Sequence, residues 1–192
     1  MRAYGLLPFL AVVKDVPATK AIGWSMLPIT LHTLHDAATS TKSPGYKKAA
    51  VAVSLALGTC AVALVTGSTL PSDLAAWVIL LVLGSVDILS ILFPDKMMQM
   101  LEYTTTFKQN DYQLRFVTQS IGVHSLCHLA MVWALTKGEN PLRAVGYSTF
   151  LTAILGTVVC IIQPNMRKSG APVEPMIPFT AMFAYMAWKL LR

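Results

Sequence analysis

The sequence predicts an all-α, polytopic membrane protein with about six transmembrane helices. Hydrophobic residues make up 55% of its 192 residues and charged residues only 12%, and the charged residues lie almost entirely in short stretches between long apolar runs. A soluble protein of this size needs polar groups over its whole surface, whereas lipid can face apolar runs without cost. Because backbone polar groups in lipid must be satisfied within their own segment, each span is expected to be helical.

Six apolar segments are expected to cross the bilayer, and a helix needs roughly 20 apolar residues to do so. These segments are residues 21–38, 49–66, 74–93, 117–135, 144–162 and 175–191. The second and third are almost uniformly apolar, whereas the first carries histidines, an aspartate and a proline, and the last is short and interrupted by proline. The apolar run at residues 5–13 is too short to span and is expected to lie at the membrane interface.

The longest polar connection, residues 95–115, joins two three-helix halves of a single membrane domain, residues 1–94 and 116–192. Within it, the spacing of the apolar side chains predicts a short amphipathic helix on the membrane surface, with an exposed loop as the alternative. Those side chains are Met97, Met100, Leu101 and Phe107.

The two halves resemble each other weakly. Ala21-Ile22-Gly23 aligns with Ser120-Ile121-Gly122, and Leu57-Gly58-Thr59 aligns in the same order with Leu155-Gly156-Thr157. The restricted composition of membrane segments produces such matches by chance as well. If the duplication is real, three helices per repeat place the second copy in inverted topology, as in many transporters.

Basic residues give a formal net charge of +6 but form no continuous stripe and no patch interleaved with aromatic residues. Nucleic acid is therefore not expected as a partner. Lys42, Lys47 and Lys48 form the densest cluster and are expected to contact lipid headgroups or a partner protein, with a solvated loop as the alternative. Each charge near an anionic membrane contributes about 1 kcal/mol.

All four histidines fall in the first and fourth predicted spans. His32 and His35 are three positions apart, His124 and His128 four, so each pair shares one helix face. The functional interpretation is a ligand site for a metal, haem iron or chlorophyll magnesium, because a neutral imidazole nitrogen is a good ligand. The alternative is hydrogen bonding between helices or to headgroups.

Small residues at four-residue spacing occur in two spans, where they let helices approach closely. The second span has Ala52, Ser54, Ala56 and Gly58, and the fifth has Thr149, Ala153 and Thr157. The cysteines Cys60, Cys127 and Cys160 also lie in apolar segments without a CxxC pair, which predicts small buried side chains and no redox or zinc motif.

No phosphate loop, serine elbow, metalloprotease helix or paired acidic motif occurs in the sequence, so an enzyme is not expected. We expect a non-catalytic integral subunit of a larger membrane complex, with other integral subunits and membrane lipids as partners. The mitochondrial inner membrane or the thylakoid membrane is the favoured location. The alternatives are a small-solute or ion transporter with inverted repeats, and a haem- or chlorophyll-binding subunit.

Asp87 is an acidic residue well inside the third predicted span, where an unpaired charge costs about 3 kcal/mol. It lies about as far along its helix as His35 does along its own, so we expect a hydrogen bond from Asp87 to His35 or His32. Asp87→Asn should then be largely tolerated and Asp87→Leu should lower the melting temperature in detergent. Wild-type assembly and function in both variants would contradict the pairing.

Overall fold

The computed structural model describes residues 14, 16–67, 72–102 and 111–192, and within these ranges the regular structure is entirely helical. The predicted all-α class is thus confirmed. Three segments are long and apolar enough to cross a membrane: Pro44–Thr66, Leu74–Leu92 and Pro141–Ile162, with mean hydropathies of 2.2, 2.3 and 2.0. The predicted interfacial run at residues 5–13 and Phe107 lie outside the described residues.

Each of the six predicted apolar segments coincides with helix to within one residue at its ends, but six membrane crossings are not confirmed. The helices are α2 (Ala18–Thr39), α3 (Pro44–Thr66), α4 (Ser72–Leu92), α6 (Asp111–Thr136), α7 (Pro141–Gly156) continued by the π-helix η2 (Thr157–Ile162), and α9 (Met176–Leu191). The last of these has 16 residues. At 1.5 Å per residue α9 is about 24 Å long, shorter than a hydrocarbon core of about 30 Å.

Proline begins α3, α7 and the short helix α5 (Pro94–Met100), because its fixed φ suits the first helical turn and its missing N–H is not needed there. Pro44 and Pro141 occupy this position in α3 and α7. The Ser43 hydroxyl accepts a hydrogen bond from the Tyr46 N–H at 3.2 Å, and the Asn140 side chain accepts one from Leu142 at 2.8 Å. These caps satisfy N–H groups that the helix itself cannot pair.

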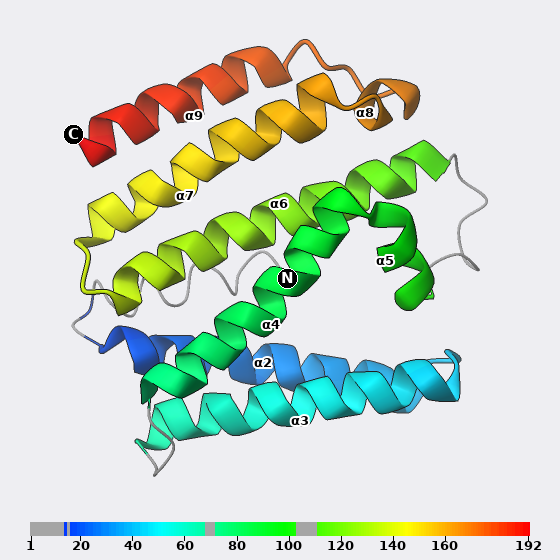
Figure 1. The fold of residues 1–192 in the computed structure, drawn as a ribbon, viewed down its shortest axis with the longest axis vertical. Helices are drawn as coiled ribbons and strands as arrows, with labels where there is room; N and C mark the ends of the chain where they lie inside the picture. Colours follow the sequence, from blue (N-terminus) through cyan, green and yellow to red (C-terminus); the bar gives the residue numbers. More distant parts are fainter. Residues whose placement is uncertain (1–13, 15, 68–71, 103–110) are drawn as a thin grey trace. The chain divides into compact units, whose positions relative to one another are not determined.

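A short helix, α5 (Pro94–Met100), is present at the start of the polar connection, and its predicted amphipathic position on the membrane surface stays a prediction. Met97 and Met98 are buried, whereas Met100 is 63% exposed. A second short helix, α8 (Asn165–Lys168), follows η2. Both lie at the ends of longer helices and reverse the direction of the chain (Figure 1).

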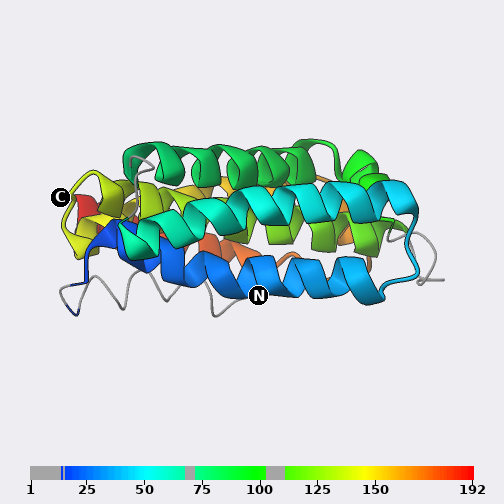
Figure 2. The same ribbon diagram turned by 90° about the horizontal axis from the view of Figure 1, so that it is seen from below.

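The chain divides into two compact units, Met1–Val82 and Leu83–Arg192, and the division falls within α4. In the first unit α2 and α3 lie side by side as a hairpin (Figure 2). The two helices approach closely at Gly23, where an added Cβ would lie 2.7 Å from the Ala61 carbonyl oxygen and 3.0 Å from the Leu64 Cβ. Only glycine permits this contact.

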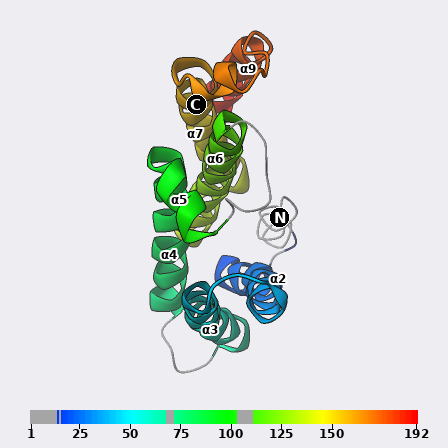
Figure 3. The same ribbon diagram turned by 90° about the vertical axis from the view of Figure 1, so that its right-hand side faces the viewer.

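In the second unit α6, α7 and α9 lie in a row, with α7 in the middle (Figures 1 and 3). Gly146 of α7 lets α9 approach closely, because an added Cβ would lie 2.8 Å from the Leu191 side chain of α9. The core between α4, α6 and η2 contains Ile91, Val123, Cys127 and Val159.

The π-helix η2 changes the last turn of the span that begins with α7. Here the Gln163 N–H donates to the Val158 carbonyl at 2.9 Å, five residues back rather than four. The wider turn rotates the residues that follow relative to those before it. Gln163 and the start of α8 owe their direction to this turn.

The inverted repeat is not confirmed. Gly23 and Gly122 align in the proposed duplication and both make close contacts, but Gly23 packs on the following helix and Gly122 on the preceding one. An added Cβ at Gly122 would lie 2.7 Å from the Asp87 carbonyl oxygen of α4. Aligned positions therefore meet different neighbours.

Gly23→Ala should lower the free energy of unfolding by about 1–3 kcal/mol, the usual cost of forcing an extra carbon into a packed contact. Gly58→Ala is the matched control in the same hairpin, since its Cβ would meet Thr30 at an ordinary 3.9 Å. It should be neutral or stabilise by up to about 1 kcal/mol through helix propensity. Thermal unfolding in detergent measures both, and equal effects would contradict the close α2–α3 packing.

Candidate functional site

A band of polar side chains runs between α6 and the α4–α5 segment in the second unit. Arg115, Gln119, Gly122 and Ser125 lie on one face of α6, because their spacing of three and four residues matches the helical period. We call this band, together with its partners, the polar seam. Its members are Asp87, Ile91, Asp95, Arg115, Gln119, Gly122, Ser125, Gln163 and Asn165.

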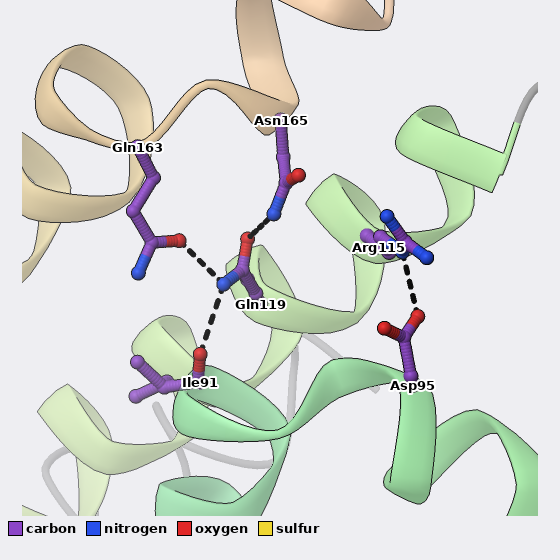
Figure 4. Close-up of polar contacts among 6 residues, drawn as sticks. All are labelled: Ile91, Asp95, Arg115, Gln119, Gln163 and Asn165. Atoms are coloured by element: carbon purple, nitrogen blue, oxygen red, sulfur yellow. Dashed lines mark hydrogen bonds and ion pairs between the residues drawn. The ribbon is translucent and has the colours of Figure 1, made fainter.

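Gln119 is the centre of the polar seam and is only 2% exposed. Its amide nitrogen donates to the Ile91 carbonyl at 2.9 Å and to the Gln163 side-chain oxygen, and its own oxygen accepts from the Asn165 amide at 2.9 Å (Figure 4). One side chain thereby joins the end of α4, the residue that follows η2 and the start of α8.

The Ile91 carbonyl needs this donor because α4 ends at Leu92. The last four carbonyls of a helix have no partner within it. Pro94 begins α5 almost at once and interrupts the hydrogen-bond ladder, since it has no N–H to offer. The Gln119 amide supplies the Ile91 carbonyl with a donor from another helix.

At one end of the polar seam, the Arg115 guanidinium contacts the Asp95 carboxylate at 2.6 Å (Figure 4). Half of the Asp95 side chain is exposed, so this ion pair contributes at most about 1 kcal/mol. Arg115 and Lys168 also lie 5.4 Å and 4.9 Å from the Tyr112 ring centre. These groups mark the aqueous end of the seam.

At the other end lies Asp87, which is 6% exposed. The Ser125 hydroxyl lies within hydrogen-bonding reach of its carboxylate. Among the described residues, none reaches the second carboxylate oxygen, Oδ2, which is fully buried. The backbone of Asp87 is held by close contact with Gly122. The seam thus presents one incompletely paired carboxylate within an apolar helix.

The two histidines of α6 lie away from the polar seam. His124 is exposed and His128 half-buried, and at about 100° per residue both point toward the opposite side of α6. His32 and His35 are exposed residues of the first unit, so their predicted pairing with Asp87 stays a prediction. In the described part of the chain, no group of three or more metal-ligating side chains gathers. Binding of haem, chlorophyll or metal also stays a prediction.

The predicted basic cluster is partly engaged in the α2–α3 turn. The Tyr46 hydroxyl donates to the Asp36 carboxylate at 2.8 Å, and the Lys42 ammonium lies 3.5 Å from the same oxygen. Lys42 also lies 4.0 Å from the Tyr46 ring centre. Lys47 is half-buried, while Lys48 is exposed at the start of α3.

The small residues predicted to pack helices fall on different faces. In α3, Ser54 is buried and Gly58 faces Thr30 of α2, whereas Ala52 and Ala56 are exposed. In the fifth predicted span, Thr149 and Ala153 are buried in α7, and Thr157 is partly buried in η2. One stripe of each span thus contributes to packing inside the chain.

The three amides at the centre of the polar seam were not among the residues predicted to form a site, because they are not ionisable. Gln119 stands near the start of a predicted span, and Gln163 and Asn165 stand just beyond the end of another. The sequence does hold one indication of this cluster. Three amides occur at the ends of consecutive predicted spans, and a helix-breaking proline, Pro94, ends the span before them. No protein-family model, curated protein or solved structure matches the chain. The polar seam is therefore defined by its geometry alone.

Gln119→Met should lower the free energy of unfolding by about 1–3 kcal/mol, because it keeps the shape of the side chain but removes donors and acceptors from three groups. The half-buried Gln163 and Asn165 can regain water, which limits the loss. Gln99→Met, at an exposed site on α5, should change it by less than about 0.5 kcal/mol. Equal melting temperatures for both variants in detergent would show that the seam does not hold these segments.

Proposed function

We propose that the chain is a non-catalytic integral subunit of a larger membrane protein complex. The observation that carries this proposal is the extent of apolar helix surface left uncovered by the chain itself. In the most hydrophobic 18-residue window of Pro141–Ile162, 22% is buried. The neighbouring α9 exposes large apolar side chains away from α7, among them Phe179, Met182 and Met186.

The length of α9 supports partner helices rather than lipid alone as the cover for this surface. A helix that is apolar on all sides is stable inside a protein core or a membrane. Because α9 is shorter than the hydrocarbon core, a lone helix leaves a mismatch that association with other helices relieves. Phe179, Met182 and Met186 lie on one face and offer a contact stripe without any polar group that needs pairing.

The chain extracted in mild detergent should migrate on native electrophoresis with other integral membrane proteins. Phe179→Ala with Met186→Ala should release these partners while leaving the melting temperature within a few degrees, since both side chains are exposed. Phe179→Leu with Met186→Leu retains most of the apolar area and should retain them. Migration of the intact wild-type chain only as a free monomer or homodimer would exclude the proposal.

A second function, transport of a proton or small cation, is favoured by Asp87 specifically. A buried carboxylate with one unpaired oxygen inside a membrane helix is the arrangement that proton- and ion-coupled transporters use. Purified chain in liposomes should then move the ion, and Asp87→Asn should abolish the flux. Flux that persists after replacement of His32, His35, Asp87, His124 and His128 would rule out this site.

A further inference from the structure

A groove of about 1010 Å³ lies between α9 and the span formed by α7 and η2, on one face of the helix row. Its lining is almost entirely apolar. Small side chains line it from both sides, including Ala153 and Thr157 on one side and Ala181 and Ala184 on the other. Ile161 of the π-helix lies toward one end and Arg192 at the other.

Two features of the chain create this groove. Gly146 holds the end of α9 close to the start of α7, so the two helices meet there at the Leu191 side chain. Further along, alanines on α9 leave a furrow where larger residues would close the gap. The wider turn of η2 forms part of the opposite wall through Thr157, Val158 and Ile161.

The end of the groove at Arg192 is strongly basic. The Lys189 ammonium and the Arg192 guanidinium lie 4.9 Å and 5.3 Å from the Trp188 ring centre. Arg143, near the start of α7, pairs with Glu139 at 3.8 Å. Lysine, arginine and tryptophan at the end of an apolar helix are typical of the level of the lipid headgroups.

We propose that this groove binds one acyl chain of an anionic phospholipid, with its phosphate held by Lys189 and Arg192. Charge complementarity distinguishes this occupant from a partner helix, which has no need of two cations at the end of an apolar furrow. The groove is long enough for an acyl chain that crosses one leaflet, because it runs from Ile177 to Arg192, about 22 Å along α9, and one leaflet of the hydrocarbon core is about 15 Å thick.

The proposal does not rest on the function above, since lipid surrounds the chain whether it is free or in a complex. It also concerns a different face of α9 from the stripe of Phe179, Met182 and Met186, none of which lines the groove. The two proposals therefore succeed or fail separately.

The test is native mass spectrometry of the purified full chain in detergent, titrated with dioleoyl phosphatidylglycerol or dioleoyl phosphatidylcholine. The wild type should retain one phosphatidylglycerol in preference to phosphatidylcholine. Lys189→Gln with Arg192→Gln should weaken phosphatidylglycerol binding roughly 30-fold (about 2 kcal/mol), since each basic residue near an anionic headgroup contributes about 1 kcal/mol. Inorganic phosphate at the same concentration should not displace the lipid.

The acyl chain is tested by filling the furrow. Ala184→Phe and Ala181→Phe, both at exposed positions, should weaken binding of either lipid at least tenfold without lowering the melting temperature. Met182→Phe on the other face of α9 is the matched control and should bind like the wild type.

Lys96→Gln with Arg167→Gln removes the same charge at exposed positions away from the groove and should also leave binding unchanged. Wild-type affinity in both furrow variants would overturn the proposal. So would an equal loss in the Lys96/Arg167 variant, which would indicate attraction to the net charge alone, or displacement of the lipid by inorganic phosphate.

Discussion

A helix end that is buried must find donors for its last carbonyls, and at the end of α4, where Ile91 is buried, one side chain of another helix provides one. Gln119 donates to the Ile91 carbonyl and is itself fixed by Gln163 and Asn165. In water such a carbonyl would be solvated at little cost, but in an apolar environment an unpaired one costs several kcal/mol. The position of α6 relative to the end of α4 follows from this requirement.

Close helix packing in both units depends on the absence of a side chain. Lipid tails are as apolar as leucine, so membrane helices gain little from hydrophobic burial and associate through contact and hydrogen bonds. Gly23, Gly122 and Gly146 each admit a neighbouring helix at a distance that a Cβ would prevent. The close approach at Gly122 also brings Asp87 near Ser125.

The positions of the helices could be predicted from the sequence because long apolar runs, polar breaks and prolines at the first turn act locally. The start of α7 at Pro141, for example, follows from Asn140 and Pro141 alone. The centre of the polar seam could not be predicted, since Gln119 meets Gln163 and Asn165 across more than forty residues of chain. Burying an uncharged amide in an apolar segment also costs less free energy than burying the carboxylate of Asp87, so an amide stands out less in the sequence. The alignment of the two halves did match Gly23 with Gly122, but that match predicted an internal duplication and not the close helix contacts that both residues make.

The π-helical turn at the end of the fifth apolar segment has a consequence for tolerance to change in length. Deleting one residue between Thr157 and Ile162 would let the ordinary 4-residue hydrogen-bond step replace the 5-residue one, and Gln163 would still face Gln119. If the same number of residues instead wound as a regular α-helix, everything after them would turn by about 100°, the rotation of one residue. Gln163 would then point away from Gln119. The wider turn therefore absorbs one extra residue of chain without changing the direction of the residues that follow.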